Sequence, residues 1–421
     1  MKSLYNDYIT RISDILDKKP TQRNFSVEGL EKAVNSTAIR EAKDSASSLP
    51  VLKSQLPTLF GVPSGYKSVP TIGTHPNFAD MKFGDKRYQY CASMFIDIKG
   101  STNLSINYNL EQVRMMKDAI LSLCIQTVTV FGGHVQRLQG DGLYVQFTDK
   151  SIHQNNMMIN ALNAASVLCQ FVSTTLADLF QQHTLKPLRI KVGIDFAENE
   201  KCLWSHYGLP GCNELTATSL HVDLAAKLQA RCASNEIRIG QYVKQFLDLP
   251  SEFLKTPLKD DGKEDTYIKS SINYRQYIFD WQAYLLMFDF VHKGNNRLEI
   301  EQPEYKLVCY YTDESGNEKQ YFQNNGSLPK NIKLRFVLMK NGKQYSRPQY
   351  DTITWKIVNR GEEATAANNV VLAIDESKNK TSVIVDTAYL GHHYIECVIK
   401  RTLGNHGIIP NKKMKFGVYV R

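Results

Sequence analysis

The chain has 421 residues, a length that suggests two or three domains. Charged residues make up 22% of it and hydrophobic residues 42%, a balance that excludes a disordered or fibrous protein. The net charge of +9 comes without a Lys/Arg-rich cluster, so we expect no nucleic-acid partner, whereas an anionic small ligand is compatible with it.

The sequence predicts neither membrane insertion nor secretion. The most apolar stretch, residues 161–180, is interrupted by polar side chains, and the N-terminal residues contain no apolar signal region. The eight cysteines form no CxxC pair, a pattern typical of buried thiols in a reducing compartment. We therefore expect a cytoplasmic protein.

The first 60 residues are predicted to form an N-terminal helix and a linker. Leu4, Tyr8 and Ile12 recur at helical spacing within residues 1–17, and residues 18–55 are polar.

Residues 61–250 are predicted to form an α+β domain. The apolar pattern indicates strands at 90–98, 135–138, 143–147, 188–196 and 237–239, and helices at 110–131, 157–180 and 221–233. The order βαββαβ predicts a mostly antiparallel, ferredoxin-like sheet with its helices on one face.

The remaining residues change in character. We expect a helical connector over residues 251–300, where the segment 274–292 is rich in aromatic residues. Residues 301–421 carry almost only strand signals at about 10-residue spacing, which predicts an all-β sandwich.

One segment whose residues could take part in catalysis is FIDIKGSTNL, residues 95–104. A predicted strand brings Asp97 to its end, and Gly100, Ser101 and Thr102 then open a helix whose free N–H groups could bind phosphate. Taken alone, a capped helix start beside an incidental acid explains this pattern equally well.

A second segment, GGHVQRLQGDGLYVQF at residues 132–147, places Asp141 at the tip of a hairpin. Asp-Gly is also the commonest hairpin turn. In this element order, however, the end of the first strand and the hairpin tip lie side by side. Because two adjacent carboxylates repel each other unless a cation lies between them, Asp97 and Asp141 are interpreted as a Mg²⁺ or Mn²⁺ site.

The order of FxDIxGST, GGxxxxxxGDG, a GID strand and HVDLAAKL over residues 88–245 resembles the catalytic domain of class III nucleotidyl cyclases. The resemblance implies a homodimer that binds a nucleoside triphosphate at its interface. One protomer would hold two divalent cations, Mn²⁺ or Mg²⁺, through Asp97, Asp141 and the Ile98 carbonyl. The other would supply the residues that read the base and stabilise the transition state.

Other positions depart from the family pattern. The two base-reading positions, Lys or Glu and Asp or Cys in purine cyclases, fall on Arg137 and Thr216. The family's Asn-x-x-x-Arg pair, which steadies the ribose and the α-phosphate, falls on Asp223 and Lys227. Lysine can neutralise phosphate charge but lacks the planar fork of arginine. The resemblance thus implies altered transition-state residues and no purine-reading pair.

Residues 305–311, 353–364 and 393–404 look like the C-terminal sensor domain of some adenylyl/guanylyl-like cyclases and other bacterial second-messenger synthases. A cyclase with a non-purine pocket and this sensor resembles the Pycsar cyclases of bacterial anti-phage defence. Those enzymes make cyclic pyrimidine mononucleotides that switch on a separate effector protein.

We therefore expect a pyrimidine nucleotide cyclase that converts CTP or UTP to the 3′,5′-cyclic monophosphate and pyrophosphate. The whole-protein resemblance favours cytidylate over uridylate, while Arg137 and Thr216 leave that choice open. Two alternatives remain: an adenylyl or guanylyl cyclase with unusual base contacts, and a degenerate cyclase that only binds nucleotide as a sensor.

Overall fold

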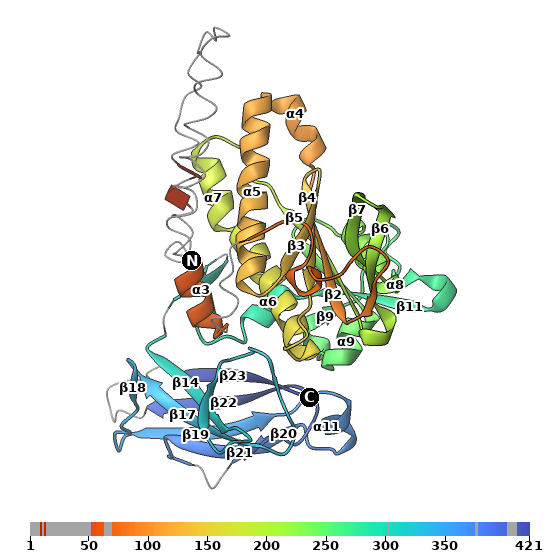
Figure 1. Ribbon diagram of the computed structural model, residues 1–421. Coiled ribbons are helices and arrows are strands. Elements are labelled where there is room, and N and C mark those ends of the chain that lie inside the picture. The colour runs from red at the N-terminus through yellow and green to blue at the C-terminus, as the bar shows by residue number, and fades with distance from the viewer. Residues whose placement is uncertain are drawn as a thin grey trace.

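The computed structural model describes residues 9–10, 12–13, 52–62, 70–295, 297–301, 303–374, 378–401 and 411–421. Most of the predicted N-terminal helix and nearly all of the polar linker lie outside these residues. Figure 1 shows two halves, an upper one that mixes helices with a sheet and a lower one built mainly of strands. Helix α3 (Leu52–Phe60) packs against the upper half, where Phe60 contacts Phe131 with ring centroids 5.2 Å apart.

The upper half is organised around an eight-stranded sheet in the order β10-β11-β8-β5-β2-β4-β3, with β9 paired to β11. Neighbouring strands are antiparallel except β5 and β8, which run parallel. The predicted βαββαβ order is confirmed. The strands are β2 (Cys91–Ile98), β3 (His134–Gln139), β4 (Gly142–Phe147), β5 (Ile190–Ala197), β8 (Glu236–Gly240), β9 (Leu254–Lys255), β10 (Tyr267–Lys269) and β11 (Tyr274–Phe279).

Helices cover both faces of this sheet, so the expectation that they lie on one face is wrong. Helices α5 (Leu110–Val130) and α6 (Gln154–Ser173) pack on one face, and α8 (Leu220–Ala230) packs on the other. Gly193 of β5 permits this close approach, because a Cβ there would lie 2.3 Å from the Ala225 carbonyl oxygen of α8.

The helix predicted over residues 157–180 breaks at Thr174 into α6 and α7 (Thr175–Gln182). Within the described chain, the stretch 154–182 is long and apolar enough to cross a membrane. However, 94% of its apolar window is buried inside the protein, as expected of a core helix.

Two features of the upper half differ from the sequence analysis. Strands β6 (Leu203–Leu209) and β7 (Cys212–Thr218) form an unpredicted hairpin, which pairs with β1 (Lys86–Tyr88) in a second small sheet. Its polar strands offer little apolar alternation to detect. The helix expected over residues 274–292 begins instead with strand β11, which pairs with β8, and only α10 (Trp281–Leu285) is an α-helix there.

The lower half is the predicted β-sandwich. Side chains from both of its five-stranded sheets, such as Phe336 and Phe416, share one hydrophobic core. One sheet contains β14 (Tyr305–Thr312), β15 (Glu318–Tyr321), β17 (Lys333–Lys340), β18 (Lys343–Gln344) and β21 (Ser382–Asp386). The other contains β16 (Ser327–Leu328), β19 (Asp351–Val358), β20 (Val371–Ala373), β22 (Gly391–Arg401) and β23 (Lys412–Val420).

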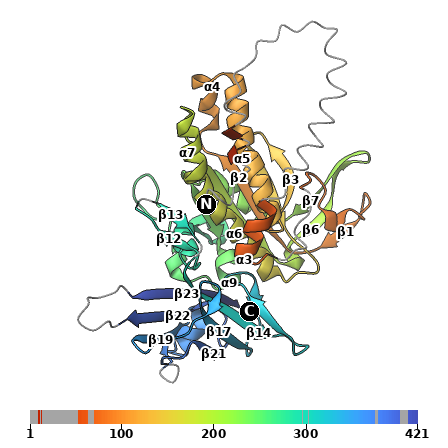
Figure 2. The ribbon, with the colours of Figure 1, turned by 90° about the vertical axis from the view of Figure 1, so that its left-hand side faces the viewer.

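The two halves are joined by buried contacts. Figure 2 shows strands β22 and β23 directly beneath the upper half. The Asn163 side chain of α6 donates a hydrogen bond to the Asn324 carbonyl, at 3.1 Å. The rings of Phe253 and His392 meet at a centroid distance of 5.3 Å. The halves therefore pack against each other instead of being connected only by the chain.

Candidate active site

The two aspartates predicted to bind metal lie at one edge of the large sheet. Asp97 is the penultimate residue of β2, and its register partner on β4 is Gly142. Asp141 immediately precedes Gly142 in the hairpin turn, where Gly140 adopts a left-handed conformation with φ of 66°. The two carboxylates therefore occur on neighbouring strands at the same end of the sheet.

A lysine that sequence reasoning missed already contacts this edge. Lys191 of β5 is the other register partner of Asp97, and its Nζ lies 2.6 Å from Asp97 Oδ2. The only available signal was strand pairing, which places residues 94 positions apart side by side. The ammonium shows that the Asp97 carboxylate attracts a cation in this position. Two carboxylates and the adjacent Ile98 carbonyl are the oxygen donors that Mg²⁺ and Mn²⁺ prefer, so these residues fit a divalent cation.

The loop after Asp97 opens only short helical turns. Gly100 has φ of 74° and precedes a 3₁₀ turn (Ser101–Asn103) and the four-residue helix α4 (Leu104–Asn107). Ser101 is buried, whereas Thr102 is exposed. The long helix α5 begins later, at a capping box formed by Asn109 and Gln112. The three residues proposed to meet phosphate thus lie in a tight turn beside Asp97 instead of at the start of a long helix.

The two predicted base-reading residues lie close to a third polar residue. Arg137 of β3 forms an ion pair with Glu214 of β7, with Nη2 2.8 Å from Oε2. Thr216 lies two residues further along β7 and is almost completely buried. Glu214 escaped the sequence analysis because the β6–β7 hairpin was not predicted.

Helix α8 carries the other predicted pair, Asp223 and Lys227, one turn apart on its exposed face. Buried polar contacts behind the helix fix its start. The His221 imidazole contacts Asp195 at 3.0 Å, and the Tyr274 hydroxyl donates a hydrogen bond to the other Asp195 oxygen at 2.8 Å. Burial raises the pKa of the Asp195 carboxyl, and the hydrogen bonds from His221 and Tyr274 oppose that shift.

Asp97 and Arg137 lie on the sheet face that carries α8. Side chains alternate along β2, so Phe95 and Asp97 point to this face while Met94 and Ile96 enter the core under α5 and α6. Phe95 stacks on Tyr144, and Tyr144 is the register partner of Arg137. The same face of the sheet thus carries Asp97 at its edge, Arg137 with its partner Glu214, and helix α8.

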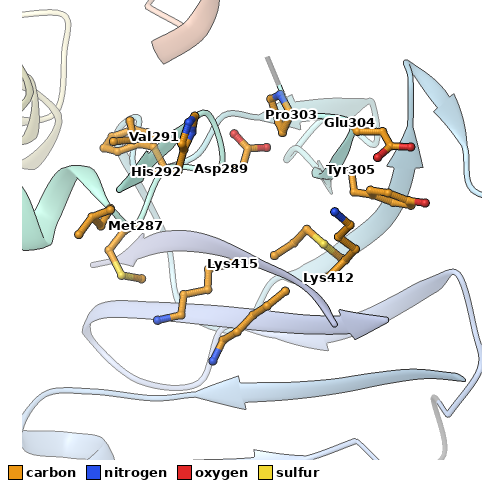
Figure 3. A pocket seen from close by; sticks show the side chains of 13 residues that line it. Met287, Asp289, Val291, His292, Pro303, Glu304, Tyr305, Lys412 and Lys415 are labelled. Atoms are coloured by element: carbon orange, nitrogen blue, oxygen red, sulfur yellow. The ribbon is translucent and has the colours of Figure 1, made fainter. Parts of the chain in front are cut away.

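A separate pocket of about 410 Å³ lies where the connector meets the sandwich. Figure 3 shows Asp289 and His292 on one side of it, and Tyr305 and Lys412 on the strands that close it. Burial raises the pKa of Asp289 to about 6. None of the predicted site residues lines this pocket.

The motif order, the sheet topology and the placement of the two aspartates at a sheet edge define a class III nucleotidyl cyclase domain. Residues 287–421 match the Adenylyl/Guanylyl and SMODS C-terminal sensor domain. A cytidylate cyclase from Staphylococcus aureus is 34% identical over 86% of this chain and 86% of its own length. A cytidylate cyclase from Escherichia coli is 29% identical over 90% of this chain and 87% of its own length. The chain belongs to the cytidylate cyclase family.

Solved structures with similarity to this chain include the adenylyl cyclase CyaB from P. aeruginosa. It is 19% identical and aligns over 46% of this chain and 95% of its own, with a TM-score of 0.39. The guanylyl cyclase Cya2 is 18% identical over 47% of this chain and 93% of its own, with a TM-score of 0.36.

Proposed function

We propose that this protein cyclises CTP to 3′,5′-cyclic CMP and pyrophosphate. The observation that carries the proposal is its 34% identity to a cytidylate cyclase over 86% of both chains. Asp97 and Asp141 at the sheet edge support an active enzyme and argue against a degenerate nucleotide sensor. The absence of the usual purine-reading pair at Arg137 and Thr216 argues against the adenylyl or guanylyl alternative.

In this proposal Asp97, Asp141 and the Ile98 carbonyl hold two divalent cations. When bound, such cations lower the pKa of the ribose 3′-hydroxyl and neutralise the charge of the triphosphate. Lys191 pairs with Asp97 Oδ2 only, so Oδ1 would be available to a cation, and the ammonium would compete for Oδ2. The Gly100–Thr102 turn lies beside these ligands and offers backbone N–H groups to the phosphates.

Residues on α8 complete the chemistry. The ribose 3′-hydroxyl gives up its proton to water, and its oxygen forms a bond to the α-phosphorus while the bond from that phosphorus to the bridging oxygen of pyrophosphate breaks. Lys227 neutralises the charge that develops on the α-phosphoryl oxygens, and Asp223 accepts a hydrogen bond from a ribose hydroxyl. We place Asp223 and Lys227 in one protomer of a homodimer, together with Arg137 and Thr216, opposite the metal aspartates of the other protomer.

We also propose a cellular role in bacterial anti-phage defence. The enzyme acts in the cytoplasm, its C-terminal sensor domain controls when it is active, and its cyclic nucleotide acts on a separate effector protein. The support is the joining of a pyrimidine-type cyclase to a sensor domain of this family.

The test is to incubate the purified protein with each of the four nucleoside triphosphates and Mn²⁺, and to identify the products by mass. Cyclic CMP is the expected main product. If cyclic UMP dominated, the protein would be a uridylate cyclase. Cyclic AMP or cyclic GMP as the main product would support a purine cyclase, and the formation of no product would support a nucleotide-binding sensor.

Charge-removing variants test the metal site. Asp97→Asn and Asp141→Asn should abolish product formation while leaving the fold intact. Asp118→Asn is a matched control, because Asp118 is exposed on α5 and is not part of the proposed site. Full activity of either site variant would contradict the metal assignment.

A further inference from the structure

Glu214 is held in a closed set of polar contacts with two residues of β3. Its Oε2 pairs with Arg137 Nη2 at 2.8 Å, and its Oε1 accepts a hydrogen bond from the Gln136 side-chain amide. The Gln136 side-chain oxygen in turn accepts from Arg137 Nε at 2.9 Å. Gln136 is only 2% exposed, so this amide fixes both charged groups in one orientation.

These contacts leave hydrogen-bonding capacity for a ligand. The side chains of Arg137 and Glu214 remain 39% and 43% exposed. The contacts described for Arg137 use two of its five N–H groups, and each carboxylate oxygen of Glu214 can accept a further bond. Thr216, two residues along β7, points to the same side as Glu214. A donor, an acceptor and a hydroxyl therefore lie together at the position where the family reads the base.

The chemistry of the pyrimidines makes this arrangement selective. Cytosine presents an amino donor at C4 beside the acceptors N3 and O2, whereas uracil presents an acceptor at C4 and a donor at N3. A carboxylate is the usual partner of the cytosine amino group, and a guanidinium can meet N3 and O2. Uracil would place its O4 against the Glu214 carboxylate. Because both are acceptors, neither the O4 nor the carboxylate oxygen would receive a hydrogen bond.

We infer that Glu214 is a third base-reading residue, which selects CTP over UTP by accepting a hydrogen bond from the cytosine amino group. The inference rests on the proposed cytidylate cyclase function. It differs from that proposal in assigning the choice between the two pyrimidines to one carboxylate that lies outside the two family positions.

The experiment measures cyclic CMP and cyclic UMP formed from an equimolar mixture of CTP and UTP. Glu214→Gln should lower the product ratio by about tenfold or more, because the amide can turn its N–H toward uracil O4. Glu214→Asp, which keeps the charge, should retain more of the preference. Glu198→Gln is the matched control, since Glu198 pairs with Lys201 at the surface and should leave the ratio unchanged.

A substrate analogue distinguishes two roles of Glu214: direct contact with the base, and positioning of Arg137. The ribonucleoside triphosphate of pyrimidin-2-one is CTP without its amino group. The natural enzyme should use it at least about tenfold less well than CTP, and Glu214→Ala should use both about equally. Equal losses on CTP and on the analogue in Glu214→Ala would overturn the inference and leave Glu214 as a support for Arg137. If the natural enzyme made no cyclic pyrimidine at all, the proposed function itself would fail.

Discussion

The Asp97 side chain pairs with Lys191 and is also the proposed ligand of a divalent cation. Its carboxylate is 27% exposed at the sheet edge, and Lys191, only 16% exposed, lies against it at 2.6 Å. A partly buried pair of this kind is screened less by water than a surface ion pair. The lysine therefore pairs with the Asp97 carboxylate and competes with any cation that binds there.

We predict that Lys191→Met tightens the binding of divalent cations, because it removes a competing positive charge from the proposed metal ligand Asp97. The Mn²⁺ concentration that gives half of the maximal activity should fall several-fold, whatever happens to the maximal rate. Lys186→Met, on an exposed loop position, is the control. An increase in the required Mn²⁺ would show that Lys191 assists metal binding instead.

Among the elements, helix α8 is positioned by two residues of β5. Gly193 has no side chain to hold the helix away, and the buried Asp195 carboxylate contacts the start of the helix. Gly193 lets the helix backbone approach β5, and Asp195, two residues later on the same face, contacts His221 at the helix start. Gly240 makes room for that aspartate, because a Cβ there would lie 2.2 Å from Asp195 Oδ1. The helix that carries Asp223 and Lys227 thus depends on this face of the sheet.

We predict that Gly193→Ala displaces α8 and reduces activity strongly, while the free energy of unfolding falls by about 1–3 kcal/mol. A Cβ at this position would meet backbone atoms of Ala225 and Gln229 at 2.3 Å, which cannot move away as a flexible side chain would. Unfolding by denaturant and the turnover number would measure the two effects.

Gly262→Ala provides the control for that experiment. Gly262 has φ of 79° in a loop, with no atom within 4 Å of an added Cβ, so only backbone strain is expected. A normal turnover number in Gly193→Ala would contradict the view that the approach of α8 to β5 sets the active geometry.

At the scale of the whole molecule, Arg360 and His392 join the catalytic half to the sandwich. The Arg360 guanidinium lies over the rings of Phe253 and Tyr394, and its Nη1 is 3.3 Å from His392 Nδ1. Since arginine only donates, His392 Nδ1 accepts and its Nε2 carries the proton that reaches Asn324 Oδ1. This geometry requires a neutral imidazole, and burial holds the pKa of His392 well below its usual value.

We predict that stability falls as the pH drops below about 6.5, the pKa of histidine in the unfolded chain. Below that pH the unfolded chain binds a proton that folded His392 does not, so protonation favours unfolding. The midpoint of denaturant unfolding, measured between pH 7.5 and 5, should therefore decrease, and His392→Gln should reduce this dependence. Phe253→Leu should lower stability at every pH but keep the slope. An unchanged slope in His392→Gln would contradict the prediction.

The proposed homodimer with shared sites allows a direct test of the assembly. An Asp97→Ala protomer and a Lys227→Ala protomer should each be inactive alone. Mixed after separate purification, they should recover up to about a quarter of the natural activity, because half of the dimers are mixed and each contains one intact site. Inactive mixtures with proven heterodimers would show that each chain builds its site from its own residues.

Elements with strong periodic signals and local motifs could be predicted from the amino-acid order alone. Apolar runs predicted β2 and β4, apolar alternation predicted β5, and three- to four-residue spacing predicted α5. Asp97 and Asp141 could be paired in advance, because a strand end and the tip of the next hairpin adjoin whenever those strands pair. These features depend on neighbours in the sequence or on one short connection.

Which distant side chains meet depends on how the strands and helices pack in three dimensions. The contact between Gln136 and Glu214 spans 78 residues and depends on how the β6–β7 hairpin lies over the sheet. Lys191 reaches Asp97 because β5 lies beside β2, and α8 occupies the second face because Gly193 leaves space there. Periodicity reports whether a residue is buried, but it carries no information about which residue lies opposite. The placement of Asp97 and Asp141 at one sheet edge could therefore be anticipated from the chain alone, and the contact of Glu214 with Arg137 could not.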